Sequence, residues 1–146
     1  RGEIDGKDYV FLTKDAFAKR VQNNEFLEHT KVFGNDYGTL KKTVEVYRNS
    51  GRHVILVIDT EGAKKLKDLI EATLIFIYPP SITELKQRLK ARKTESSVSL
   101  KEKLDKAAQE VTQSTIFDYK VVNNNIELAF KELSNIILGK KNKEVL

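Results

Sequence analysis

The sequence contains no cysteine, and its only histidines are His29 and His53. Without cysteine there is no disulfide framework, no thiol nucleophile and no cysteine-ligated zinc or iron–sulfur site. The two histidines lie far apart in the sequence and have no carboxylate partner at ligand spacing, which is typical of ordinary surface or strand-start residues. Any chemistry of this chain must therefore rest on other side chains.

Long apolar runs are also missing from the 146 residues. No run approaches the roughly 18 to 20 apolar residues that a membrane helix needs, and residues 1–10 lack the apolar core of a signal peptide. We therefore expect a soluble, cytoplasmic protein without a membrane partner. With 40% hydrophobic and 32% charged residues, a chain of this length fits one compact domain.

The net charge is +5, and most of the positive excess lies after residue 80. A basic surface favours anionic partners, which include nucleotides, nucleic acids and acidic peptides. Basic residues are densest between 86 and 93. There Arg88 and Arg92 share one helix face and could clamp a polyphosphate, although a solvated basic face is the alternative. Aromatic residues are not interleaved with this cluster, as base stacking requires, so we expect no nucleic-acid partner.

The first third of the chain mixes short strand signals with amphipathic helices. Residues 9–11 and 26–33 predict strands, residues 15–24 and 40–50 predict helices, and residues 34–38 are typical of a break between elements.

Apolar runs from residue 54 onward indicate an α/β fold with a parallel sheet. Residues 54–58 and 74–78 are continuous apolar runs, which predict strands buried on both faces, and residues 61–71 are long enough for a crossover helix between them. Residues 119–122 predict a third core strand. Further helices are predicted over 81–91, 97–113 and 126–138.

Three side chains at turns and strand ends are candidates for contacts with a nucleotide. Asp59 closes an apolar run, a position at which many nucleotide-binding α/β proteins place an acid beside a metal-bound phosphate, although aspartate also begins turns well. Tyr9 and Tyr37 lie beside turns, where a phenol can bind a phosphate oxygen. Packing of each ring with its hydroxyl at the surface is the alternative.

Glu28 is unusual because it lies inside an apolar stretch. A carboxylate there could accept hydrogen bonds from both N1–H and N2–H₂ of guanine, a pair of donors that adenine does not present. The alternative is an outward position on an alternating strand.

No segment of the sequence matches the phosphate-binding loop G-x-x-x-x-G-K-[ST]. Gly6-Lys7 is followed by Asp8, and Gly139-Lys140 is followed by Lys141.

The order of these segments resembles the guanylate kinase family. The matching segments are GEIDGKDYVF at 2–11, NEFLE at 24–28, GNDYGT at 34–39, IDTEG at 58–62, IFIYPPS at 75–81, RL at 88–89, RKTES at 92–96 and DYKVVN at 118–123. The resemblance covers essentially all 146 residues. It implies a P-loop NTPase-like parallel sheet flanked by helices, with a small mixed α/β GMP-binding subdomain and a helical lid. The implied bounds are 1–52 for the GMP-binding subdomain, 53–82 and 114–146 for the core, and 83–113 for the lid.

The resemblance implies phosphoryl transfer from ATP to GMP, with Mg²⁺ as cofactor and GMP and ATP as partners. By this resemblance Glu28 and Thr39 read the guanine edge. Tyr9 and Tyr37 bind the GMP phosphate, and Glu3 supports that pocket.

For the donor side, the resemblance makes Arg88 and Arg92 lid arginines. They would stabilise negative charge on the phosphoryl group in flight, because this chemistry needs no covalent step. Asp59 would lie near the Mg²⁺ and the phosphates, and Asn123 near the adenine of ATP.

The sequence departs from the family pattern at several positions. Val57 stands where the family usually has a carboxylate, and Glu61 where it usually has glutamine. Lys103 replaces a third lid arginine, which keeps the charge but loses the bidentate fork. Asn124 and Asn125 replace the usual acidic pair.

In the family, a first strand, a P-loop and its helix precede the position of Arg1. We therefore expect the first strand and P-loop helix to be absent, which makes this chain an N-terminally truncated form that is inactive alone. We expect the protein to be a monomer or a dimer. The alternative is a non-catalytic guanylate-kinase-like module that binds phosphorylated or acidic protein segments. The retained lid signature at Arg88, Arg92 and 94–96 argues against that module.

Overall fold

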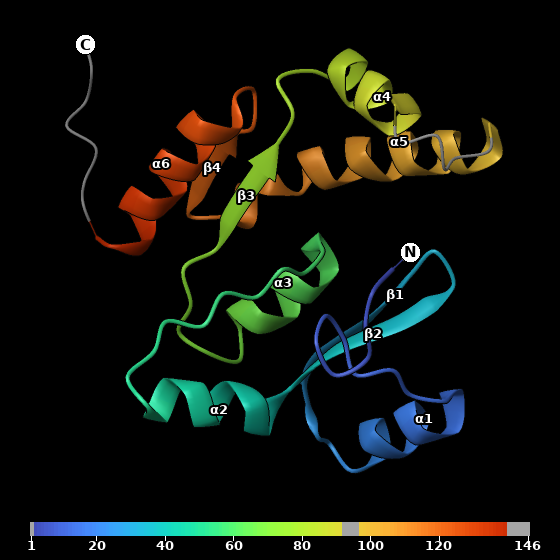
Figure 1. Cartoon of the computed structure of the whole chain (residues 1–146), viewed down its shortest axis with the longest axis vertical. Coiled ribbons are helices and arrows are strands. Elements are labelled where there is room, and N and C mark those ends of the chain that lie inside the picture. Colours follow the sequence, from blue (N-terminus) through green and yellow to red (C-terminus); the bar gives the residue numbers. More distant parts are fainter. Residues whose placement is uncertain (1, 92–96, 140–146) are drawn as a thin grey trace. The chain divides into compact units, whose positions relative to one another are not determined.

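A computed structural model describes residues 2–91 and 97–139 of the chain (Figure 1). Arg92 and residues 94–96, which carry part of the predicted lid, lie outside the described residues. The chain divides into two compact units, residues 1–70 and 71–146. The division implied by the resemblance, into a GMP-binding subdomain, a core and a lid, stays a prediction.

A β-hairpin is the only sheet among the described residues of the first unit. Strand β1 (Phe26–Val32) pairs antiparallel with β2 (Asn35–Leu40). Phe33 and Gly34 join the strands with φ angles of 48° and 83°, as in the tight turns that match the twist of a hairpin. The prediction that residues 34–38 break the chain was wrong beyond Gly34, because pairing with β1 supplies the backbone hydrogen bonds that residues of low strand propensity need.

Three helices complete the described part of the first unit. They are α1 (Lys14–Gln22), α2 (Lys41–Asn49) and α3 (Thr60–Lys67). Helix α1 begins at Thr13, whose hydroxyl accepts a hydrogen bond from the amide of Ala16, as N-cap residues do. All three helices lie where the sequence predicts them, with ends that differ by a few residues.

Residues 9–11 form no strand, contrary to the prediction. Tyr9 makes only an isolated bridge with Asp5. The segment is instead held as a loop by two carboxylates, since Asp5 accepts from the amide of Phe11 and Asp8 from that of Ile4, each at 2.8 Å. These side-chain bonds give the backbone an alternative to a strand ladder.

Residues 54–58 also form no strand, so the predicted βαβ unit over 54–78 and the burial of this segment on both faces are wrong for this structure. Val57 is 98% exposed and Ile55 is exposed too, whereas Val54, Leu56 and Ile58 are half-buried. The physical reason is that an apolar run becomes a strand only by pairing with a neighbour, and no described strand pairs with these residues.

The second unit contains two of the three predicted core strands, and these two are parallel. Strand β3 (Ile75–Tyr78) pairs in parallel with β4 (Tyr119–Val122), from Ile75 opposite Tyr119 to Tyr78 opposite Val122. Between them lie α4 (Ile82–Ala91), α5 (Ser97–Thr112) and a short 3₁₀ turn (Ser114–Ile116), and α6 (Ile126–Ile137) follows β4. This connection by helices is what parallel pairing requires.

The core of the second unit centres on Val121 of β4, which is fully buried. Leu74, Leu89 and Ala129 are buried as well. Asp118 secures the start of the sheet, because its carboxylate accepts from the amide of Leu74 at 2.7 Å and its own amide donates to the Leu74 carbonyl at 2.9 Å. No helix in the described parts of the chain is both long and apolar enough to cross a bilayer.

Replacing the N-cap of α6 tests the packing of this helix. The Oδ1 atom of Asn125 accepts from the amides of Glu127 and Leu128, at 2.9 and 3.0 Å. We expect Asn125→Ala to lower the free energy of unfolding by about 1 kcal/mol, measured by urea denaturation. The control is Asn124→Ala, which changes the neighbouring asparagine and should have a smaller effect; equal losses would show that the cap contributes nothing.

Candidate functional site

The buried carboxylate of Glu28 is the centre of the candidate site in the first unit. Glu28 is only 5% exposed, which rules out the outward strand position that the sequence left open. Burial of a charged group is costly unless hydrogen bonds compensate it. A polar residue at such a position therefore marks either a structural pair or a binding site.

Thr39 supplies one of these hydrogen bonds. It lies directly opposite Glu28 in the hairpin, and its hydroxyl donates to Glu28 Oε1 at 2.7 Å. A carboxylate offers about four lone-pair directions, so Glu28 can accept from further donors. Because the Thr39 hydroxyl uses its hydrogen in this bond to Glu28, its oxygen can act toward a ligand only as an acceptor.

The first turn of α3 contacts the same carboxylate. A Cβ atom at Gly62 would lie 2.9 Å from Glu28 Oε2, so the main chain passes close to this oxygen. The same helix is tied to β1 farther along, where Lys65 Nζ donates to the carbonyl of His29. Helix α3 and the hairpin thus enclose Glu28 from two sides.

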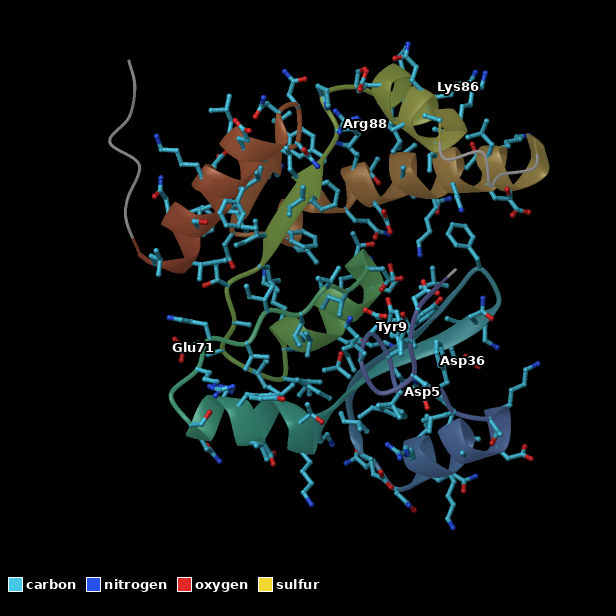
Figure 2. The ribbon with its side chains drawn as sticks, viewed as in Figure 1. Asp5, Tyr9, Asp36, Glu71, Lys86 and Arg88 are labelled. Carbon is cyan, nitrogen blue, oxygen red and sulfur yellow. The ribbon has the colours of Figure 1, made fainter. Side chains whose placement is uncertain are left out.

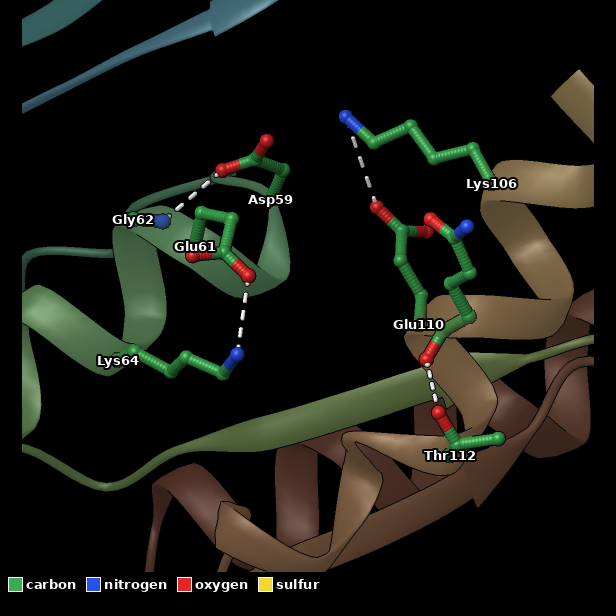
Figure 3. Close-up of polar contacts among 8 residues, drawn as sticks. Asp59, Glu61, Gly62, Lys64, Lys106, Glu110 and Thr112 are labelled. Carbon is green, nitrogen blue, oxygen red and sulfur yellow. Dashed lines mark hydrogen bonds and ion pairs between the residues drawn. The ribbon is translucent and has the colours of Figure 1, made fainter. Parts of the chain in front are cut away.

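Asp59 acts as the N-cap of α3. Its Oδ1 atom accepts from the amide of Gly62 at 2.9 Å (Figure 3). This is the turn-starting role that the sequence gave as the alternative, and it occupies one oxygen of the carboxylate. The expected place of Asp59 near Mg²⁺ and phosphate stays a prediction. Glu61, in the first turn of α3, forms an ion pair with Lys64 at 2.9 Å.

The structure brings the two predicted phosphate-binding tyrosines together. The rings of Tyr9 and Tyr37 meet edge to face with centroids 6.0 Å apart, and both side chains are exposed. Figure 2 shows Tyr9 beside the hairpin. Glu3 lies on the same exposed N-terminal segment. A ligand phosphate could thus reach both phenol groups from solvent.

Two predicted site residues of the second unit also meet. Arg88, on α4 (Figure 2), donates from Nη1 to the Asn123 carbonyl at 2.8 Å and from Nη2 to the Asn124 carbonyl at 3.4 Å. Its Nε donates to Glu84 Oε1 at 2.9 Å. Two of the five N–H groups that a guanidinium carries therefore hold α4 to the segment after β4, and a third is used within α4.

The remaining predicted lid residue that is described, Lys103, is half-buried on α5. The same helix carries an ion pair between Lys106 and Glu110, 3.8 Å apart (Figure 3). Arg92 lies outside the described residues, so its predicted pairing with Arg88 stays a prediction.

Comparison with known proteins decides the family. The pattern of the family described as guanylate kinase matches residues 1–140. The chain belongs to the guanylate kinase family. It is 43% identical over 138 residues to a guanylate kinase of Protochlamydia amoebophila, covering 94% of this chain and 70% of that protein. It is 44% identical over 141 residues to one of Clostridium perfringens, covering 96% of this chain and 65% of that protein.

A solved structure agrees with this membership of the guanylate kinase family. The crystal structure of guanylate kinase from Anaplasma phagocytophilum matches with a TM-score of 0.80 at 35% identity, covering 98% of this chain and 70% of that one. The predicted α/β fold class is thereby confirmed. The chain spans about two thirds of the length of these relatives.

Gly62 borders the Glu28 carboxylate, but the sequence alone predicts no role for this residue. It stands in a predicted helix, where glycine is about 1 kcal/mol less favourable than alanine. That cost is a signal of a close approach, but the partner in the approach, Glu28, lies 34 residues away in the sequence.

Removing the Thr39 hydroxyl tests the buried pair. We expect Thr39→Val to lower the free energy of unfolding by about 1 to 3 kcal/mol, because a buried charge loses a hydrogen bond while the side chain keeps its shape. Thermal and urea unfolding measure the loss. Thr30→Val, in the same hairpin, is the matched control; a loss no larger at Thr39 than at Thr30 would mean that Glu28 does not depend on this bond.

Proposed function

We propose that this chain binds GMP, with the guanine base at Glu28 and Thr39, as the acceptor part of an ATP:GMP phosphotransferase. The observation that carries the proposal is the buried Glu28 carboxylate, which accepts a hydrogen bond from the Thr39 hydroxyl. Together the two groups present only acceptors to a ligand. Membership of the guanylate kinase family supports the same substrate.

The acceptor set suits the Watson–Crick edge of guanine, which offers N1–H and N2–H₂ as adjacent donors. Adenine instead places an unprotonated N1 at this edge. Its one donor at this edge, N6–H₂, cannot serve both carboxylate oxygens, so part of the buried carboxylate would be desolvated and unpaired, which costs more than a lost contact at an exposed site. Selectivity for GMP over AMP follows from this difference.

The phosphate of GMP is assigned to the paired phenols of Tyr9 and Tyr37. Their hydroxyl groups can donate to phosphate oxygens, and both rings are exposed on the unit that carries Glu28. Glu3 is proposed to support this pocket, as the resemblance implies.

For the donor nucleotide, we propose that Asn123 lies near the adenine of ATP and that Arg88 and Arg92 act on the phosphates. The bond between Arg88 and the Asn123 carbonyl supports placing these two residues at one nucleotide. Arg88 retains two of its five N–H groups for phosphate oxygens. Lys103 adds positive charge in the same role.

The proposed cofactor is Mg²⁺, bound with ATP. Mg²⁺ would neutralise charge on the β- and γ-phosphates and orient them. It is usually held by one or two carboxylates together with substrate phosphates. No three side chains of the metal-binding types form a group among the described residues. Asp59 is proposed as the carboxylate near Mg²⁺ and the phosphates, as the resemblance implies.

Phosphoryl transfer also needs groups that hold the donor phosphates, and the 146 residues contain no G-x-x-x-x-G-K-[ST] loop. We therefore propose that this stretch of chain binds GMP and does not turn it over by itself. A cytoplasmic location is also proposed, because highly charged nucleotides do not cross membranes unaided.

Replacing the carboxylate by its amide tests the assignment of the guanine site. Glu28→Gln should weaken GMP binding about 10- to 100-fold, since one acceptor of a charge-assisted pair becomes a donor facing a donor. AMP affinity should not fall. Isothermal titration calorimetry measures both, and Glu45→Gln, an exposed residue of α2, is the control.

Three outcomes of this titration differ in meaning. A normal chain that binds no GMP would overturn the proposed substrate. Equal GMP affinity in Glu28→Gln and the normal chain would move guanine recognition elsewhere. Displacement of GMP by a phosphopeptide whose own affinity survives Glu28→Gln would favour the binding-module alternative.

A second test separates the phosphate from the base. Tyr37→Phe removes one hydroxyl while keeping the ring, so we expect GMP affinity to fall about 3- to 10-fold, the value of one hydrogen bond. Guanosine, which has no phosphate, should bind as before. Tyr47→Phe on α2 is the control, and a parallel loss for guanosine would contradict the assigned role.

A further inference from the structure

Gly62 is a glycine that the backbone conformation does not require. The glycines at 2, 6, 34, 51 and 139 have positive φ angles and open space around a Cβ position, which is the usual reason for glycine. Gly62 instead lies inside α3, where alanine is preferred over glycine. Something other than backbone freedom must account for it.

The surroundings of Gly62 supply that reason. A Cβ atom there would lie 2.9 Å from Glu28 Oε2, and 3.4 Å from both Glu28 Cδ and Asp59 Oδ1. Gly62 is buried, so a methyl group could not turn outward to solvent. Any side chain at this position therefore meets the Glu28 carboxylate first.

The carboxylate is thus positioned from two directions. The Thr39 hydroxyl holds Oε1 at 2.7 Å, and the bare backbone of Gly62 borders Oε2. The Gly62 amide donates to Asp59 Oδ1 at 2.9 Å (Figure 3). This hydrogen bond holds the first turn of α3 in place. The depth at which the carboxylate lies is therefore set by the absence of a side chain at 62.

We propose that Gly62 is a specificity-determining position, whose missing side chain leaves room for Glu28 to reach both guanine donors. The inference rests on the proposed GMP site. Gly62 touches no part of the base in this account and acts only through Glu28. A methyl group at 62 displaces the carboxylate, and a displacement of about 1 Å suffices to spoil a pair of hydrogen bonds.

The test is Gly62→Ala, in which stability and binding should respond differently. The atom that the methyl group meets is the end of a flexible side chain, and alanine favours the helix. The melting temperature should therefore change by no more than a few degrees. GMP affinity should fall at least about tenfold. IMP lacks the 2-amino group and uses fewer of these bonds, so the ratio of GMP to IMP affinity should shrink.

A double-mutant cycle separates positioning from a general structural effect. If Gly62 acts through Glu28, then Gly62→Ala should change GMP affinity less than about twofold once Glu28→Gln is present. Lys67→Ala, an exposed position on the same helix, is the control for a change in helix propensity and should leave the GMP to IMP ratio unaltered.

The outcomes distinguish this inference from the function on which it rests. If the normal chain binds no GMP, the proposed function and the inference both fail. If the normal chain binds GMP and Gly62→Ala binds it equally well, the inference alone is overturned. An equal loss in both backgrounds of the cycle would also overturn it, since Gly62 would then act independently of Glu28.

Discussion

A buried negative charge constrains the N-terminal unit more than any other feature. Glu28 is almost fully removed from water, and such a group is tolerated only where hydrogen bonds replace the lost hydration. The hairpin register that sets Thr39 opposite Glu28 supplies one bond. Helix α3 approaches the carboxylate closely at Gly62 and limits the space around its Oε2 atom. We propose that guanine uses the remaining acceptor capacity of the carboxylate.

The second unit shows a related arrangement with the opposite charge. Arg88 is satisfied by Glu84 and by main-chain carbonyls of Asn123 and Asn124. Main-chain acceptors are fixed by the fold, so the guanidinium is ordered before any ligand binds, which lowers the entropy cost of using its other donors. In each unit, one charged side chain is held by partners that include a second segment of the chain, and these partners use only part of its hydrogen-bonding capacity.

Much of this architecture could be predicted from sequence, and the failures share a physical cause. Local patterns place the helices and the strand over 119–122, because periodicity and caps are local properties. Strand formation at 54–58 depends on a neighbour, and at 35–40 pairing overrides poor propensity. Whether Glu28 points inward depends on what covers the hairpin. The role of Gly62 rests on a contact with a residue distant in sequence, which no local pattern reveals.

The most direct measurement for the central claim is the imino proton of bound GMP, observed by proton NMR on the normal chain. A proton held between guanine N1 and the buried Glu28 carboxylate should appear as a sharp downfield signal protected from exchange with water. The amide signals of Glu28, Thr39 and Gly62 should shift together as GMP is added. Binding of GMP without a protected imino signal, and with amide shifts confined to other residues, would contradict the account.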